Sequence, residues 1–143
     1  MDKTDLLDIL KKSIRKNNLV VYNSGKSMLP LIKPNSRLTV KYSCDINTGD
    51  IILIDTTDHF VVHRVIKKIK GNSLFLTKGD SNLNFDKTVS SESIIGKVIK
   101  VNNIKLTTRK WSVLNYIISK FSYAAGLLPA FLRQFKYSLQ FLF

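Results

Sequence analysis

FVVHRVIKKI-KGN-SLFLT, residues 60–77, is the stretch that decides the fold of this chain. Both arms are rich in Val, Ile, Leu, Phe and Thr, which favour β-strands. The Lys-Gly-Asn between them is typical of a turn that closes a hairpin. We therefore expect an antiparallel sheet in the middle of the chain.

The same pattern extends in both directions from this hairpin. Further β-type runs cover Leu19–Tyr22, Arg37–Tyr42, Ile51–Ile54, Ile94–Val101 and Ile104–Thr107. A chain of 143 residues forms one substantial core. The predicted fold class is mainly β, with a compact antiparallel β domain over residues 19–108. A short helix over residues 1–18 precedes this domain, and a helical segment over residues 109–143 follows it.

The N-terminal segment has the period of an amphipathic helix. Its apolar residues recur at helical spacing, with acids early and bases late. It is too polar to span a bilayer, because a span needs about 20 mostly apolar residues.

The C-terminal segment carries two apolar stripes. The first consists of Trp111, Leu114, Ile118, Phe121 and Ala125, beside a narrow polar strip of Ser112, Asn115, Ser119 and Ser122. The second consists of Leu128, Phe131, Leu132, Phe135, Leu139 and Leu142. Basic amphipathic helices of this kind lie in the headgroup region of membranes. The alternatives are a helical hairpin packed on the sheet and a dimer contact.

The charge points to a polyanionic partner. The chain has 23 Lys and Arg against 10 Asp and Glu, a net charge of +13. Such a field attracts nucleic acid or an anionic membrane. The amphipathic C-terminal segment favours an anionic membrane surface as partner over nucleic acid.

Composition also limits cofactors. The single Cys44 excludes an internal disulfide and a Cys-rich zinc site. Gly25-Lys26-Ser27 lacks the upstream glycine of a phosphate loop, which argues against nucleotide binding. We expect no cofactor and no metal.

A serine, a histidine and two carboxylates supply the parts for nucleophilic catalysis. Ser27 follows a glycine-containing turn, and a serine hydroxyl needs a neighbouring base to become a nucleophile. His63 is one of only two histidines, and His59 reads as solvated. Taken alone, Ser27 is equally consistent with a loop residue and His63 with a buried core residue.

The remaining site candidates support this pair. Asp80 and Asp86 can each orient an imidazole, and we favour Asp86 for that role and a structural role for Asp80. Gly25 allows a substrate to approach the backbone closely. The Ser27 N–H and the Ser24 hydroxyl are candidate donors to an oxyanion.

Five motifs occur in an order that resembles type I signal peptidases of the S24/S26 superfamily. They are Ser24–Pro30, Gly49–Ile52, His63–Ile66, Thr77–Asn82 with Asp86, and Ile95–Val98. The chain is most similar to the branch of the endoplasmic reticulum, archaea and some sporulating bacteria, in which histidine replaces the catalytic lysine. The resemblance covers roughly residues 19–101.

This resemblance implies a largely β serine endopeptidase that cleaves a leader or signal segment from a precursor, after small residues near an apolar segment. It assigns Ser27 as nucleophile, His63 as general base, Asp86 as orienting acid and Asp80 as a supporting carboxylate. Two departures stand out: Gly25 replaces the serine of the histidine branch, and Ser81-Asn82 replaces the usual Asn-Asn.

The expected location is membrane-associated, on an undecided side of the membrane. The N-terminal anchor of the resembled family is not found, which makes the cytoplasmic face compatible with this sequence. Two alternatives remain. One is a LexA-like or phage-repressor peptidase domain, for which the expected DNA-binding helices and lysine base are missing. The other is a non-catalytic membrane-surface binding protein that retains the fold.

Overall fold

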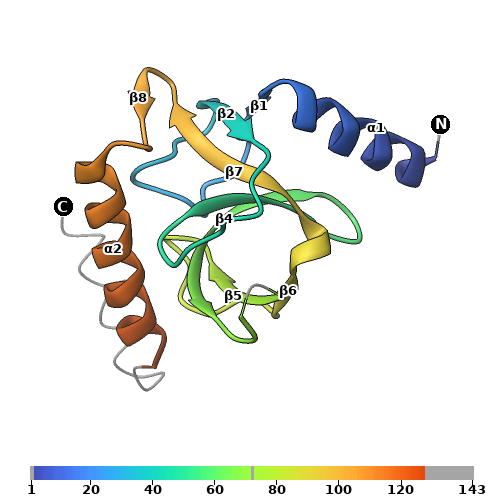
Figure 1. Ribbon diagram of the computed structural model, residues 1–143. Coiled ribbons are helices and arrows are strands. Elements are labelled where there is room, and N and C mark those ends of the chain that lie inside the picture. The colour runs from blue at the N-terminus through green and yellow to red at the C-terminus, as the bar shows by residue number, and fades with distance from the viewer. Residues whose placement is uncertain (1, 72, 128–143) are drawn as a thin grey trace.

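The computed structural model describes residues 2–71 and 73–127, and its sheet is antiparallel throughout (Figure 1). The strands follow the order β1-β2-β7-β3-β4-β5-β6, with β8 paired to β7. In chain order the elements are α1 (Lys3–Lys16), β1 (Leu19–Tyr22), β2 (Arg37–Lys41), β3 (Ile51–Asp55), β4 (Phe60–Lys68), β5 (Leu74–Lys78), β6 (Val89–Ser90), the 3-10 turn η1 (Ser91–Ser93), β7 (Ile94–Val101), β8 (Ile104–Lys105) and α2 (Arg109–Leu127). The predicted mainly β class, with a curled antiparallel sheet between two helices, is confirmed.

The predicted hairpin over residues 60–77 pairs β4 with β5. Arg64 lies opposite Lys78, and Val65 lies opposite Thr77. Successive side chains of a strand point to opposite faces. Arg64 and Lys78 therefore share one face of the hairpin, while His63, Val65 and Thr77 lie on the other.

Strand β3 lies in the middle of the sheet, between β7 and β4, and both of its faces are buried. Ile51 and Leu53 belong to the larger apolar cluster, whereas Ile52 and Ile54 belong to the smaller one. The two-residue strand β6 was not predicted, since its sequence is too short to show alternation.

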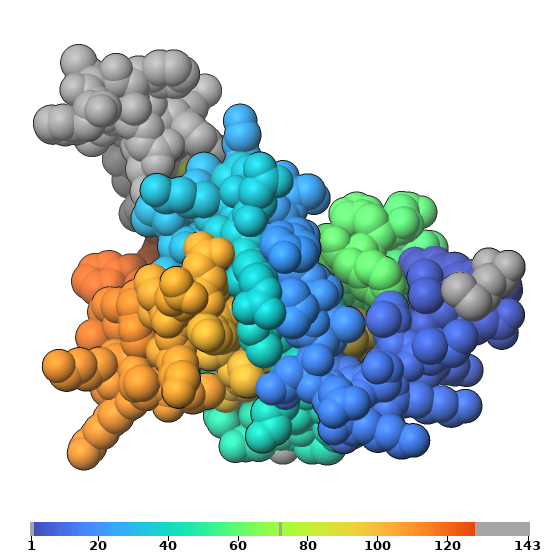
Figure 2. Space-filling view, turned by 90° about the horizontal axis from the view of Figure 1, so that it is seen from above, coloured from blue at the N-terminus to red at the C-terminus, as the bar shows by residue number. Residues whose placement is uncertain are grey.

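The two helices lie at opposite ends of the molecule (Figures 1 and 2). In α1, Asp2 caps the N-terminus and Ile14 is buried in the larger cluster. The Lys3 ammonium lies 3.2 Å from the Asp55 carboxylate and donates to the Thr57 carbonyl at 2.6 Å. These contacts tie the start of α1 to the β3–β4 turn.

Helix α2 packs on the domain through its polar strip. Asn115, Ser119, Ser122 and Gly126 are its buried residues. Within residues 2–71 and 73–127, no helix has the length and apolarity needed to cross a membrane. The second predicted stripe, from Leu128 to Leu142, lies outside the described residues.

Candidate active site

Ser27 lies in the loop between β1 and β2, which is anchored from within. The Asn23 side-chain amide donates to the Gly25 carbonyl at 2.7 Å and to the Lys33 carbonyl at 3.2 Å. Met28, the next residue after Ser27, is completely buried in the larger apolar cluster. The loop therefore has a fixed course on both sides of Ser27.

A second loop, which follows β5, clamps the first. The Ser81 N–H donates to the Ser27 carbonyl at 2.9 Å, and the Ser81 hydroxyl donates to the Lys26 carbonyl at 2.8 Å. A Cβ atom on Gly79 would lie 2.7 Å from the Ser27 carbonyl oxygen, so only glycine permits this approach. The role of Ser81 was missed, because from sequence it was only a departure from an expected Asn.

His63 joins Ser27 to Asp86. Its Nε2 lies 3.1 Å from the Ser27 Oγ, and its Nδ1 lies 2.6 Å from the Asp86 Oδ2. The Thr77 hydroxyl donates to the same Asp86 oxygen at 2.8 Å, and the Asp86 N–H donates to the Thr77 carbonyl at 2.9 Å. The structure thus brings the three predicted catalytic residues together, and it adds Thr77, which sequence reasoning did not single out.

Asp80, in the loop that follows β5, pairs with Arg64 on the face of β4 opposite to His63. Nε of Arg64 donates to Oδ1 of Asp80, and Nη2 donates to Oδ2, each over 2.7 Å. Nη1 of Arg64 donates to the Gly49 carbonyl at 2.9 Å and to Asn115 Oδ1 on α2 at 2.8 Å. Asp80 therefore holds the buried Arg64, whereas Asp86 holds His63.

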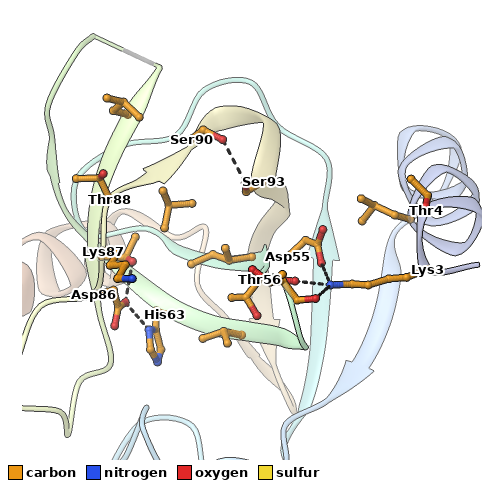
Figure 3. A pocket seen from close by; sticks show the side chains of 17 residues that line it. Lys3, Thr4, Asp55, Thr56, His63, Asp86, Lys87, Thr88, Ser90 and Ser93 are labelled. Atoms are coloured by element: carbon orange, nitrogen blue, oxygen red, sulfur yellow. Dashed lines mark hydrogen bonds and ion pairs between the residues drawn. The ribbon is translucent and has the colours of Figure 1, made fainter.

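Two cavities flank His63, and both are lined by Val61 and His63. The first has a volume of about 760 Å³ and extends from Asp86 to Lys3 on α1 (Figure 3). The second has a volume of about 610 Å³ and is lined by Ser24, Gly25 and Ser27 together with a mainly apolar wall. The wall includes Leu10, Leu19, Val21, Leu53, Phe60, Val62 and Ile95. Two of the three predicted supporting residues, Ser24 and Gly25, thus share a cavity with Ser27, whereas the third, Asp80, does not line it.

Potential metal ligands and the single thiol are distributed as follows in the part of the chain that the structure describes. Among the described residues, no group of three or more His, Cys, Asp or Glu side chains is placed to hold a metal ion. Cys44 is exposed and lies in a separate cavity with Tyr42. Its hydrogen bond to the Tyr42 hydroxyl, 3.2 Å long, raises the pKa of that hydroxyl.

Comparison with known proteins identifies the family. The family described as Peptidase S24-like matches residues 2–99, a range that contains Ser27, His63, Asp80 and Asp86. No curated protein and no solved structure matches the chain. The family match covers more than half of the 143 residues. It includes strands β1 to β6 and most of β7, and it ends before β8. On this match, the chain belongs to the Peptidase S24-like family.

Proposed function

We propose that this protein is a serine endopeptidase in which Ser27 is the nucleophile, His63 the general base and Asp86 the acid that orients the base. One observation carries the proposal: a continuous chain of contacts, 3.1 Å from Ser27 to His63 and 2.6 Å from His63 to Asp86. Both distances lie within hydrogen-bond reach, which is the first requirement for general-base catalysis.

The tautomer of His63 follows from its neighbours. An ionised carboxylate only accepts hydrogen bonds, so Asp86 takes the Nδ1–H of the ring. This leaves the lone pair of Nε2 directed at the Ser27 hydroxyl. Thr77 donates to Asp86 and fixes the carboxylate in turn. His63 is thereby held in the tautomer that can accept a proton from Ser27.

The reaction then proceeds in two halves. Ser27 Oγ attacks the carbonyl carbon of the peptide bond while its proton passes to His63 Nε2. The tetrahedral intermediate collapses, the C–N bond breaks, and His63 gives the proton to the leaving amine. Water attacks the acyl-enzyme with His63 again as base, and Ser27 leaves with the proton. The Ser27 N–H and the Ser24 hydroxyl are the proposed donors to the oxyanion.

The proposed substrate is a precursor from which a leader or signal segment is removed, as in type I signal peptidases of the histidine branch. Two observations support this substrate class. A histidine stands where the motif order places the base, and the cavity that holds Ser27 has a mainly apolar wall suited to an apolar peptide segment. Peptides with a small residue at the cut and apolar residues before it should be cleaved faster than polar peptides of equal length.

Covalent labelling tests the catalytic assignment. An acylating serine-directed inhibitor should add its mass to Ser27, as located by mass spectrometry of the digested protein. Labelling should vanish in Ser27→Ala and fall by at least about 10³-fold in rate in His63→Ala, because the hydroxyl then lacks its base. Ser13→Ala, an exposed serine on α1, is the matched control and should label like the unaltered chain. Undiminished labelling of His63→Ala would contradict the proposal, and no labelling at all would favour a non-catalytic binding protein.

A LexA-like domain that cleaves its own chain is the second candidate, and the family match favours it equally. The two candidates differ in substrate. A self-cleaving domain loses intact chain at a rate independent of its concentration and ignores added peptides. A processing peptidase stays intact and turns over added peptides, as gel analysis and peptide mass spectrometry distinguish.

A further inference from the structure

Helix α2 is attached to the domain by its polar side. Asn115 accepts from the buried Arg64, and Ser122 accepts from the buried Lys78 at 2.8 Å. The backbone of α2 at Asn115 also packs against Gly49, where a Cβ atom would lie 2.8 Å from the Asn115 carbonyl carbon. These contacts fix which side of α2 faces the sheet.

Trp111 of the same helix packs against the larger apolar cluster, but most of the large apolar residues of α2 face outward. An α-helix turns by about 100° per residue, so the positions opposite Asn115 and Ser122 are the ones centred on Ile117 and Ala124. The large apolar residues on this side are between 42% and 73% exposed. They are Val113, Leu114, Tyr116, Ile117, Phe121 and Leu127, and we call them the outer face of α2.

This orientation differs from that of an ordinary surface helix, because α2 buries polar residues and exposes most of its large apolar ones. Helices on globular domains turn their apolar stripe to the core and their polar stripe to water. The exposure of six large apolar side chains to water is unfavourable in free energy. Patches of this kind usually mark an interaction surface. Among residues 2–71 and 73–127, none of those that line the two cavities beside His63 belongs to α2. An occupant of the outer face would therefore leave the proposed active site open.

The surroundings of the outer face are basic. From residue 93 to residue 143 the sequence contains eight Lys and Arg and no Asp or Glu. Lys105, Arg109 and Lys110 are exposed where β8 leads into α2, and Lys120 lies within the outer face. The sequence that follows α2, LPAFLRQFKYSLQFLF, continues the same combination of apolar and basic residues.

We propose that the outer face of α2 binds an anionic membrane surface, with the helix lying parallel to the bilayer plane. The apolar side chains enter the boundary between headgroups and acyl chains, and the bases contact anionic headgroups. Lys120, whose ammonium lies 5.1 Å from the centre of the Tyr116 ring, reaches the headgroups along its aliphatic stem. A second copy of this chain would instead bring two basic helices together. Nucleic acid would leave the apolar side chains without a partner.

Vesicle flotation of the full chain tests the apolar contribution. The protein should float with phosphatidylcholine vesicles that contain about 30% phosphatidylserine and should float weakly with phosphatidylcholine alone. Ile117→Ser combined with Phe121→Ser should weaken binding by at least about tenfold, because two interfacial apolar side chains are lost. Ile9→Ser combined with Ile69→Ser replaces two exposed isoleucines that do not belong to α2 and should float like the unaltered chain. Circular dichroism melting checks that both double variants are folded.

Charge substitutions test the requirement for anionic lipid. Lys120→Gln should weaken binding to the phosphatidylserine vesicles by roughly fivefold, and added salt should reduce that difference. Lys12→Gln, an exposed lysine on α1, is the matched control. Equal binding to both vesicle compositions would overturn the proposal, and so would unchanged flotation of the α2 double variant. A concentration-dependent dimer that the double variant abolishes, without flotation, would also overturn it and assign the face to a second copy.

Discussion

Two neighbouring residues of β4 use two carboxylates of one loop for different purposes. His63 contacts Asp86 on the face that borders the cavities, and the two side chains are 10% and 27% exposed. Arg64 contacts Asp80 on the face beneath α2, and these side chains are 0% and 7% exposed. The accessible pair is the one to which we assign proton transfer, whereas the enclosed pair is placed to hold the loop. Because both carboxylates belong to the loop that follows β5, the enclosed pair also positions the accessible one.

Substitution on the accessible face should reduce activity and leave the fold largely intact. Asp86→Asn should lower kcat/KM for a cleaved peptide by about 10⁴-fold, since an amide no longer stabilises the protonated imidazole or selects its tautomer. The midpoint of thermal unfolding should change little. A variant that retains more than a tenth of the activity would remove Asp86 from the proposed mechanism.

Substitution on the enclosed face should chiefly reduce stability. Asp80→Ala leaves the fully buried Arg64 guanidinium without its carboxylate, which should lower the free energy of unfolding by about 3–5 kcal/mol. Chemical denaturation measures this loss. Asp58→Ala, an exposed acid in the β3–β4 turn, should change stability by less than about 0.5 kcal/mol. Similar losses for the two variants would mean that the Arg64–Asp80 pair does not hold the loop.

A smaller loss is expected where α2 meets β5. Ser122→Ala removes an acceptor from the buried Lys78 ammonium and should cost about 1–3 kcal/mol of unfolding free energy. Ser112→Ala, at the one residue of the predicted polar strip that is exposed, controls for the change in helix propensity. If both serine variants unfold at the same denaturant concentration, α2 is not held by its polar strip.

The smallest effect is expected at Thr77, beside the accessible pair. Thr77→Val keeps the shape of the side chain but removes its hydrogen bond to Asp86, worth about 1 kcal/mol. Peptidase activity should fall by about fivefold if that bond fixes Asp86. Thr88→Val is the matched control. Thr88 lines the same cavity, and in the described part of the chain its side chain makes no hydrogen bond to Asp86, so this variant should keep its activity.

The sequence was most informative where its signal is local. β1 and β7 begin and end where alternation and strand propensity predicted, and the turn at Lys70 and Gly71 joins β4 to β5. The sequence could name Ser27, His63 and Asp86 by motif order, but not their mutual distances. Those distances depend on how strands far apart in the chain pair.

Other features depend on contacts that no local pattern reveals. No local pattern marks Arg64 as a buried base, and its burial depends on Asp80 and Asn115, which both accept from it. The polar strip of α2 was visible in sequence, but the burial of that strip follows from the charged groups beneath it. Periodicity locates a stripe on a helix without telling which side faces the protein.

The clamp between the Ser27 and Gly79 loops also sets the order in which the site is assembled during folding. Lys26 and Ser81, which it joins, are separated by 55 residues of sequence. Contacts of such high sequence separation form only after the intervening chain has collapsed, because closing a long loop costs entropy before any contact repays it. A nascent chain that has been made only as far as β4 contains Ser27 and His63 but neither the clamp nor Asp86. The proposed peptidase therefore becomes competent late, once β5 and the loop after it have joined the sheet.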